Sequence, residues 1–178
     1  SLASRKRPAD IYAGFETLCK SLEYNPRMLI GLMNKFIPIA KERDIISISA
    51  QLKCLSEVFN SFKALLGTIA VQSDNNAYNT IFDFIEAIAN QFKTEVIGTE
   101  FNPEPKGRLS FLKDTNSDYL SAIGIALNAG ALIIDRDINE PFYNEADIRN
   151  ARCRLSYLFS HEFSLLTTKA RVIDLSDL

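Results

Sequence analysis

The feature that most constrains the fold is a change in hydrophobic periodicity near the middle of the chain. Before residue 98, apolar residues recur every three or four positions over several long segments, which predicts amphipathic helices. The segment GTEFNPEPKG, residues 98–107, contains two prolines and two glycines and ends this pattern. Beyond it, short alternating runs are typical of strands. The sequence therefore predicts a mainly α protein, in which a helical bundle precedes a small α+β domain.

Four helices are predicted before the break. The first covers residues 10–22, the second runs from Pro26 to Ala40, the third begins after Ser47 or Ser49, and the fourth covers residues 77–97. The expected inward face of the first helix comprises Ile11, Phe15, Leu18 and Leu22. Because a residue before proline avoids the helical region, the step into Pro26 predicts a tight joint between the first two helices. These two helices are expected to form a hairpin.

Strands and one helix are predicted after the break. The expected order is a strand at 108–112, a helix at 116–130, and strands at 131–135 and 152–159, with a long polar loop at 138–150. A helix followed by a two-stranded hairpin is the arrangement of a winged helix, with the long loop as the wing. We therefore expect three parts, a helical hairpin at 1–42, a connecting helical region at 43–105 and a winged-helix-like domain at 106–178.

The composition argues against several classes of protein. With 20 basic and 22 acidic residues, the net charge of −2 does not indicate a nucleic-acid or membrane partner. Its apolar runs are shorter than the roughly 18 residues that a membrane-spanning helix needs. The three cysteines are widely spaced and form no C-x-x-C pair, which indicates neither a zinc site nor a disulfide framework. This pattern favours the cytoplasm.

Residues 12–34, YAGFETLCKSLEYNPRMLIGLMN, resemble the lid of AAA+ ATPases of the origin-recognition-complex-like kind. Lids of that family carry a turn, then Asn-Pro-Arg, then an amphipathic helix, and Asn25, Pro26 and Arg27 match that motif here. Residues 109–178 resemble the winged-helix-like C-terminal part of the prokaryotic members. The resemblance implies that Arg27 is sensor 2, the arginine that reaches the γ-phosphate of ATP.

The chemistry of Arg27 suits that role. A guanidinium is always charged and can bind phosphate oxygens at two points, and a helix N-terminus adds partial positive charge. The other interpretation is a solvated arginine in the first turn of a helix, where a cation is mildly unfavourable.

The chain lacks the sequence of a loop that would hold the phosphates. A Walker A loop needs G-x-x-x-x-G-K-[ST], and none of the seven glycines has this spacing. No predicted strand ends in the paired acids of a Walker B motif. We therefore expect the nucleotide-binding core to lie upstream of Ser1, and ATP to bind only together with that ATPase domain. On this view the chain is not catalytic by itself, although its parent is an ATPase.

The winged-helix-like part is also a candidate DNA-binding module. Its expected recognition helix, residues 116–130, contains no lysine or arginine, whereas readers of the major groove need donors to bases or phosphates. The candidate nucleic-acid contacts are instead Arg152, Arg154, Lys169 and Arg171. Because alternate residues of a strand share a face, the first two are expected to lie together. The lack of charge on the helix favours a packing or protein-contact role.

Two other functions stay open. One is a self-contained helical protein-interaction module without a nucleotide, and the other is a DNA-binding winged-helix regulator. No catalytic residue is predicted, because His161 has no nucleophile at a recognisable spacing. No metal site is predicted either, since Asp135 and Asp137 lack further ligands in the sequence around them.

Overall fold

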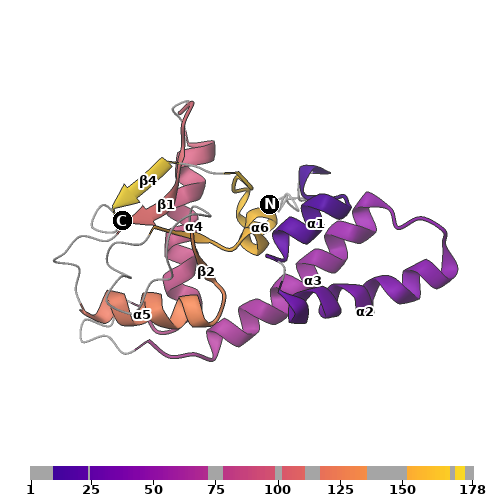
Figure 1. Cartoon of the computed structure of the whole chain (residues 1–178), viewed down its shortest axis with the longest axis horizontal. Helices are drawn as coiled ribbons and strands as arrows, with labels where there is room; N and C mark the ends of the chain where they lie inside the picture. The colour runs from indigo at the N-terminus through magenta and orange to yellow at the C-terminus, as the bar shows by residue number, and fades with distance from the viewer. Residues whose placement is uncertain are drawn as a thin grey trace, which may run out of the picture.

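The predicted break separates long helices from a small sheet in the computed structural model of the chain (Figure 1). The structure describes residues 10–23, 25–71, 78–98, 102–110, 117–135, 152–168 and 171–174. Within these residues the chain is mainly helical and contains a four-stranded mixed sheet, so the predicted fold class is confirmed.

The helices and strands have the following bounds. The helices are η1 (Asp10–Tyr12), α1 (Phe15–Ser21), α2 (Pro26–Glu42), α3 (Ile48–Gly67), α4 (Ile81–Ile97), α5 (Ser117–Asn128), η3 (Tyr157–Phe159) and α6 (Ser160–Phe163). The strands are β1 (Lys106–Ser110), β2 (Leu132–Ile134), β3 (Cys153–Leu155) and β4 (Arg171–Asp174). No helix in the described part of the chain is long and apolar enough to cross a membrane.

Side-chain caps explain where the two central helices begin. The hydroxyl of Ser47 accepts the N–H of Ala50 at the start of α3. At the start of α4, Thr80 and Asp83 form a capping box, in which each side chain accepts the backbone N–H of the other. These bonds satisfy N–H groups that have no partner within the helix. Both helices thus start at positions that their own sequence specifies.

Gly14 divides the first predicted helix. Its φ of 96° lies in the left-handed region, and its N–H donates to Oε1 of Gln51 at 2.8 Å, so η1 and α1 are separate elements. The division changes the buried face, because Ile11 and Phe15 are 73% and 80% exposed while Leu18 is buried. The prediction of one continuous inward face was therefore wrong for its first two residues.

The last predicted strand is shorter than expected. Ser156 follows β3, and its hydroxyl accepts the N–H of Leu158, which starts η3 instead of extending the strand. The prediction of a strand over 152–159 was therefore wrong after Leu155. Strand β4 was not predicted. The loop predicted as the wing, residues 138–150, lies outside the described residues.

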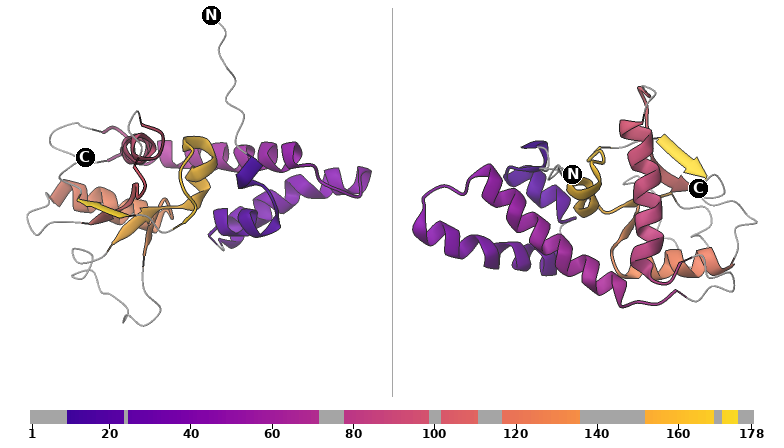
Figure 2. Two further views of the ribbon diagram at one scale, coloured as in Figure 1. Left: turned by 90° about the horizontal axis from the view of Figure 1, so that it is seen from above. Right: turned by 180° about the vertical axis from the view of Figure 1, so that it is seen from behind.

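The sheet has the order β2-β3-β1-β4. Strand β3 pairs antiparallel with both β1 and β2, and β4 pairs parallel with β1. Helix α4 contacts β1 and helix α5, and α5 contacts β2. In Figure 1, α4, α5 and the sheet lie on one side of the molecule and α1 and α2 on the other, with α3 extending from beside α2 toward α4. The main packing contact of α2 is with α3, and α1 packs against η1 and η3, so the predicted hairpin of the first two helices was wrong about which helices pack together. The two views of Figure 2 show the same separation.

One cluster of buried apolar side chains runs through all three predicted parts of the chain. Phe59 of α3 lies in its middle and meets the rings of Phe159, His161 and Phe163 edge-on, at centroid distances of 5.5, 5.4 and 6.5 Å. Edge-to-face pairs of this kind add to the stabilisation from burial. The core therefore joins the helical region to the C-terminal segment, while the domain boundaries at 42 and 105 stay a prediction.

We expect the substitution Phe59→Ala to lower the free energy of unfolding by about 3–5 kcal/mol, because it leaves a cavity under three rings. Urea titration followed by circular dichroism measures this loss. Phe15→Ala is the matched control, since the Phe15 ring is 80% exposed, and it should change stability by less than about 0.5 kcal/mol. Equal losses from both substitutions would contradict this description of the core.

Candidate functional site

The turn between α1 and α2 carries the residues of the Asn-Pro-Arg motif. Oδ1 of Asn25 accepts the N–H groups of Arg27 and Met28, at 3.0 and 3.4 Å, and Pro26 occupies the first turn, where its missing N–H costs nothing. The start of α2 is thus fixed by its own cap. The backbone of Arg27 belongs to that cap, which leaves only its side chain for another partner.

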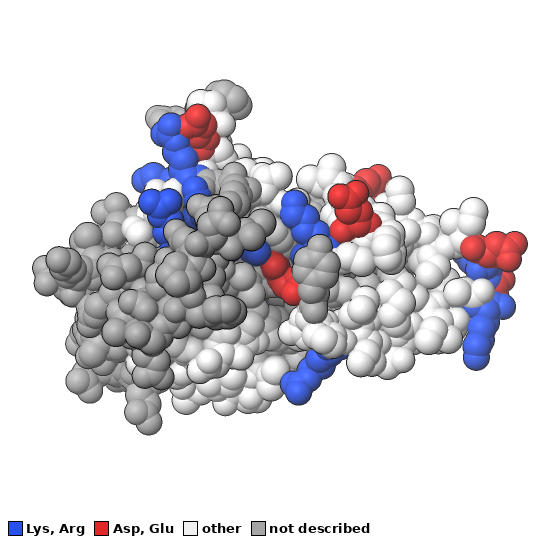
Figure 3. Space-filling model, in the orientation of Figure 1, with Lys and Arg blue, Asp and Glu red and all other residues white. Residues whose placement is uncertain are grey.

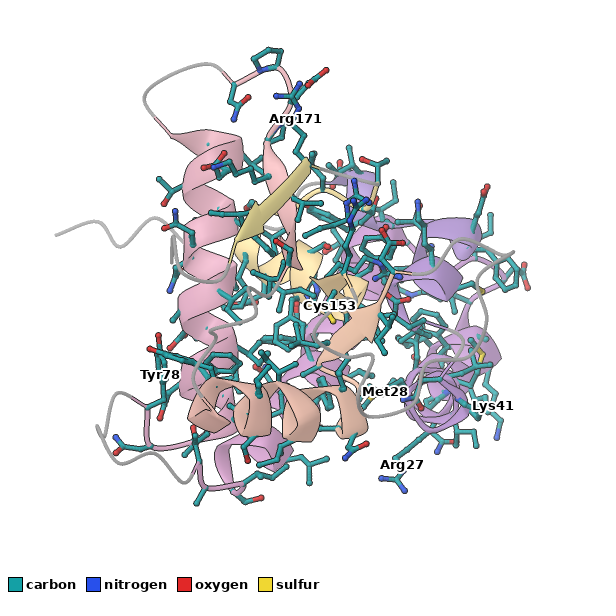
Figure 4. All side chains as sticks on the ribbon, turned by 60° about the vertical axis from the view of Figure 1, so that its left-hand side comes forward. Arg27, Met28, Lys41, Tyr78, Cys153 and Arg171 are labelled. Carbon is teal, nitrogen blue, oxygen red and sulfur yellow. The ribbon has the colours of Figure 1, made fainter. Side chains whose placement is uncertain are left out.

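The side chain of Arg27 is exposed and extends away from the rest of the molecule (Figure 4). No ion pair joins it to an acidic side chain within the described ranges. A hollow of about 80 Å³ next to the turn is lined by Asn25 and Met28 but not by Arg27. This volume is well below the roughly 300 Å³ of a typical ligand pocket. A phosphate at Arg27 would therefore meet it at the surface.

Arg154 makes an ion pair that sequence analysis did not foresee. Its Nη1 and Nη2 donate to Oε1 and Oε2 of Glu23, at 2.6 and 3.0 Å, and its guanidinium lies over the ring of Tyr157, 4.0 Å from the centroid. The two charged side chains are only 16% and 15% exposed. Burial alone would lower the pKa of Arg154, but the hydrogen bonds and charge of Glu23 outweigh it and raise that pKa.

The other candidate nucleic-acid contacts have different surroundings. Arg152 is exposed just before β3, whereas Arg171 forms an ion pair with Glu104. Lys169 lies outside the described residues. Two of the three described candidates, Arg154 and Arg171, thus have acidic partners, and Figure 3 shows basic side chains in separate groups on the face it presents. Their role in nucleic-acid binding stays a prediction.

Asp135 is in an ion pair, and the thiol of Cys153 is buried. Asp135 forms an ion pair with Arg108 at 3.0 Å, and Asp137 lies outside the described residues. Burial and the charge of Asp135 raise the pKa of the Cys153 thiol to about 12, so at neutral pH it is not a thiolate. No group of three potential metal ligands occurs among the described residues.

His161 is a core residue. It is 3% exposed, and its Nδ1 lies 2.9 Å from the carbonyl oxygen of Leu158, which identifies Nδ1 as the protonated nitrogen. Its Nε2 is buried and has no hydrogen-bond partner among the described residues. Burial lowers the pKa of His161 to about 4, because water no longer solvates the charged ring. The imidazole is therefore neutral at physiological pH.

These features define a mainly helical protein with a small α+β part. The chain has a capped helix, α2, with an exposed arginine in its first turn, and a small α+β part in which α5 connects β1 to β2. A family model described as ORC-CDC6-like matches residues 1–175, so the chain belongs to the ORC-CDC6-like family. The resemblance to this family is thereby confirmed, and it links the chain to AAA+ ATPases, whereas the likeness to the prokaryotic members stays a prediction. Comparisons with curated proteins and with solved structures find no match.

Sequence reasoning missed Glu23 at this site. The residue lies only two positions before the motif, but its partner Arg154 is 131 positions away. No spacing rule connects residues so far apart. The one available signal was an acidic residue within the turn, which by itself predicts only a solvated side chain.

The burial of His161 predicts a pH dependence of stability. Its pKa is about 6.5 when unfolded and about 4 when folded, so the unfolded chain binds the proton first as pH falls. Stability from this group is complete above pH 6.5, and about 2 kcal/mol of it should be lost by pH 5. Urea unfolding at both pH values measures the loss, and His161→Phe should reduce it. Identical pH profiles for the two proteins would contradict this assignment.

The cap of α2 predicts a local loss of stability. Asn25→Ala should cost about 1 kcal/mol, because the N–H groups of Arg27 and Met28 lose their acceptor. Asn25→Asp keeps the acceptor and serves as the control. Hydrogen exchange at these two amides should accelerate only in the alanine variant; equal exchange in both variants would show that the cap does not hold the turn.

Proposed function

We propose that this chain is the lid and C-terminal regulatory region of an AAA+ ATPase. Residues 10–42 close over ATP that an upstream nucleotide-binding domain holds, and Arg27 binds the γ-phosphate. Membership of the ORC-CDC6-like family supports the link to an ATPase. The observation that carries the proposal is the Arg27 side chain, which is exposed on a capped helix N-terminus. The chain by itself is not catalytic.

The geometry of the turn suits phosphate sensing. Because the Asn25 cap fixes the backbone of Arg27, the guanidinium reaches outward from a defined base. Two parallel hydrogen bonds from one guanidinium to phosphate oxygens add direction to the charge attraction. ADP lacks the γ-phosphate, so Arg27 distinguishes ATP from ADP.

The C-terminal part is a winged-helix-like domain in this proposal. Its strand order β2-β3-β1, with α5 between β1 and β2 in the chain, supports that assignment. We favour a protein contact over DNA for this domain, because Arg154 and Arg171 already have acidic partners within the chain. A contact with DNA would have to rest mainly on Arg152 and Lys169. The protein is proposed to act in the cytoplasm.

Arg27→Ala in the full-length protein tests the sensor role. Loss of a charge-assisted contact worth about 1.5–3 kcal/mol should weaken ATP binding about 10- to 100-fold and leave ADP binding unchanged. Calorimetric titration with each nucleotide measures both affinities. Arg43→Ala is the matched control, because Arg43 is an exposed arginine at the other end of the same helix, and it should have no effect.

Unchanged ATP affinity in Arg27→Ala would overturn the sensor role. A coding region without a Walker A loop upstream of Ser1 would remove the phosphate that Arg27 is proposed to meet. A self-contained interaction module would then be the better description. That module predicts a stable protein complex that forms equally well with and without ATP.

A further inference from the structure

The carboxylate of Glu23 lies between the turn that joins α1 to α2 and the C-terminal segment that contains β3 and η3. Besides the two bonds from Arg154, its Oε1 accepts the backbone N–H of Tyr157 at 2.8 Å. Glu23 belongs to the α1–α2 turn, while its partners belong to β3 and to the start of η3. Both carboxylate oxygens are thus used by the C-terminal part, in surroundings that leave the pair about 15% exposed.

The backbone of the turn is held both by bonds within it and by this contact. Glu23 has a φ of 53°, in the left-handed region that residues other than glycine rarely adopt. Its N–H donates to the carbonyl of Lys20, and the N–H of Asn25 donates to the carbonyl of Leu22 at 2.8 Å. An unfavourable φ persists only where the surroundings determine it. Here the local bonds at the end of α1 and the three bonds to the Glu23 side chain act together, the latter from outside the turn.

The same turn leads directly into the Arg27 cap. Asn25 lies two residues after Glu23 and accepts the Arg27 N–H, so a shift of Glu23 moves the base of the Arg27 side chain. Asn25 also lies close to the turn between α5 and β2. A side chain added at Gly130 in that turn would place its Cβ 4.0 Å from Nδ2 of Asn25. In Figure 4, Cys153 lies in the interior while Arg27 extends from the edge. The turn therefore connects the sheet to the exposed arginine.

We infer that the Glu23–Arg154 ion pair is a positioning joint that couples the contact of Arg27 with ATP to the docking of the C-terminal sheet. This inference rests on the proposed function. Arg154 acts through Glu23 and does not touch the nucleotide. By linkage, ATP at Arg27 stabilises the joint by the same factor by which the joint strengthens ATP binding. The C-terminal part thereby responds to the bound nucleotide.

The test compares ATP and ADP affinities of the full-length protein and its variants. Glu23→Gln and Arg154→Met should each lower the ratio of ATP to ADP affinity about 3- to 10-fold, because Arg27 is no longer held in position. Arg152→Met is the matched control, since Arg152 is exposed on the same segment, and it should leave the ratio unchanged. If Arg154→Met does not fold, Glu23→Gln and Arg154→Lys carry the test.

A second arm separates positioning from general stability. In an Arg27→Ala background, Glu23→Gln should cause no further change in the ratio, because the contact it positions is gone. Hydrogen exchange at the Tyr157 amide should be slower with ATP than with ADP, since that amide donates to Glu23. If the pair is merely structural, the Tyr157 amide should exchange equally fast with both nucleotides. The effects of Arg27→Ala and Glu23→Gln on the affinity ratio should then be additive.

The outcomes for the two proposals are distinguishable. If Arg27→Ala leaves the ratio unchanged, the sensor role fails and the joint fails with it. If Arg27→Ala lowers the ratio but Glu23→Gln and Arg154→Lys do not, the sensor role stands and the joint alone is overturned.

Discussion

The placement of the Arg27 turn depends on one ion pair, between Glu23 and Arg154. Both charges are mostly removed from water, so their attraction is weakly screened and either charge alone would be costly. The Tyr157 amide and ring complete the surroundings of the pair, one as a donor and the other as a face for the guanidinium. Such a contact specifies one relative position of its two sides, because its geometry is satisfied only there.

Two other contacts act together with the pair to hold the first helices on the C-terminal segment. The hydroxyl of Tyr12 donates to the carbonyl of Leu165 at 2.8 Å in a buried position. Phe59 of α3 packs against the rings of η3 and α6. The apolar contacts supply most of the stability, whereas the ion pair and the tyrosine fix direction. The polar contacts thus hold the first helices on the C-terminal segment, next to the apolar core that both share.

The sequence predicted the local features of this structure well and its distant contacts poorly. Periodicity predicted α2, α3 and α4, and Ser47 was one of two predicted starting points for α3, because these signals lie within a few residues. The break at Gly14 and the strand β4 depend on partners elsewhere, Gln51 and β1 respectively. Likewise, an arginine in a strand looks solvated until its partner is known. Arg154 was therefore predicted as a nucleic-acid contact, and its ion pair with Glu23 was not foreseen.

The measurement that tests this account most directly is a double-mutant cycle on the unfolding free energy, with Glu23→Gln, Arg154→Met and both together. For a desolvated pair we predict that each single substitution destabilises the chain by about 3 kcal/mol. We also predict that the double variant is more stable than the sum of the two losses by about 2 kcal/mol. Additive losses would contradict the account, because they would show that the two residues contribute independently and that the Arg27 turn is held by other contacts.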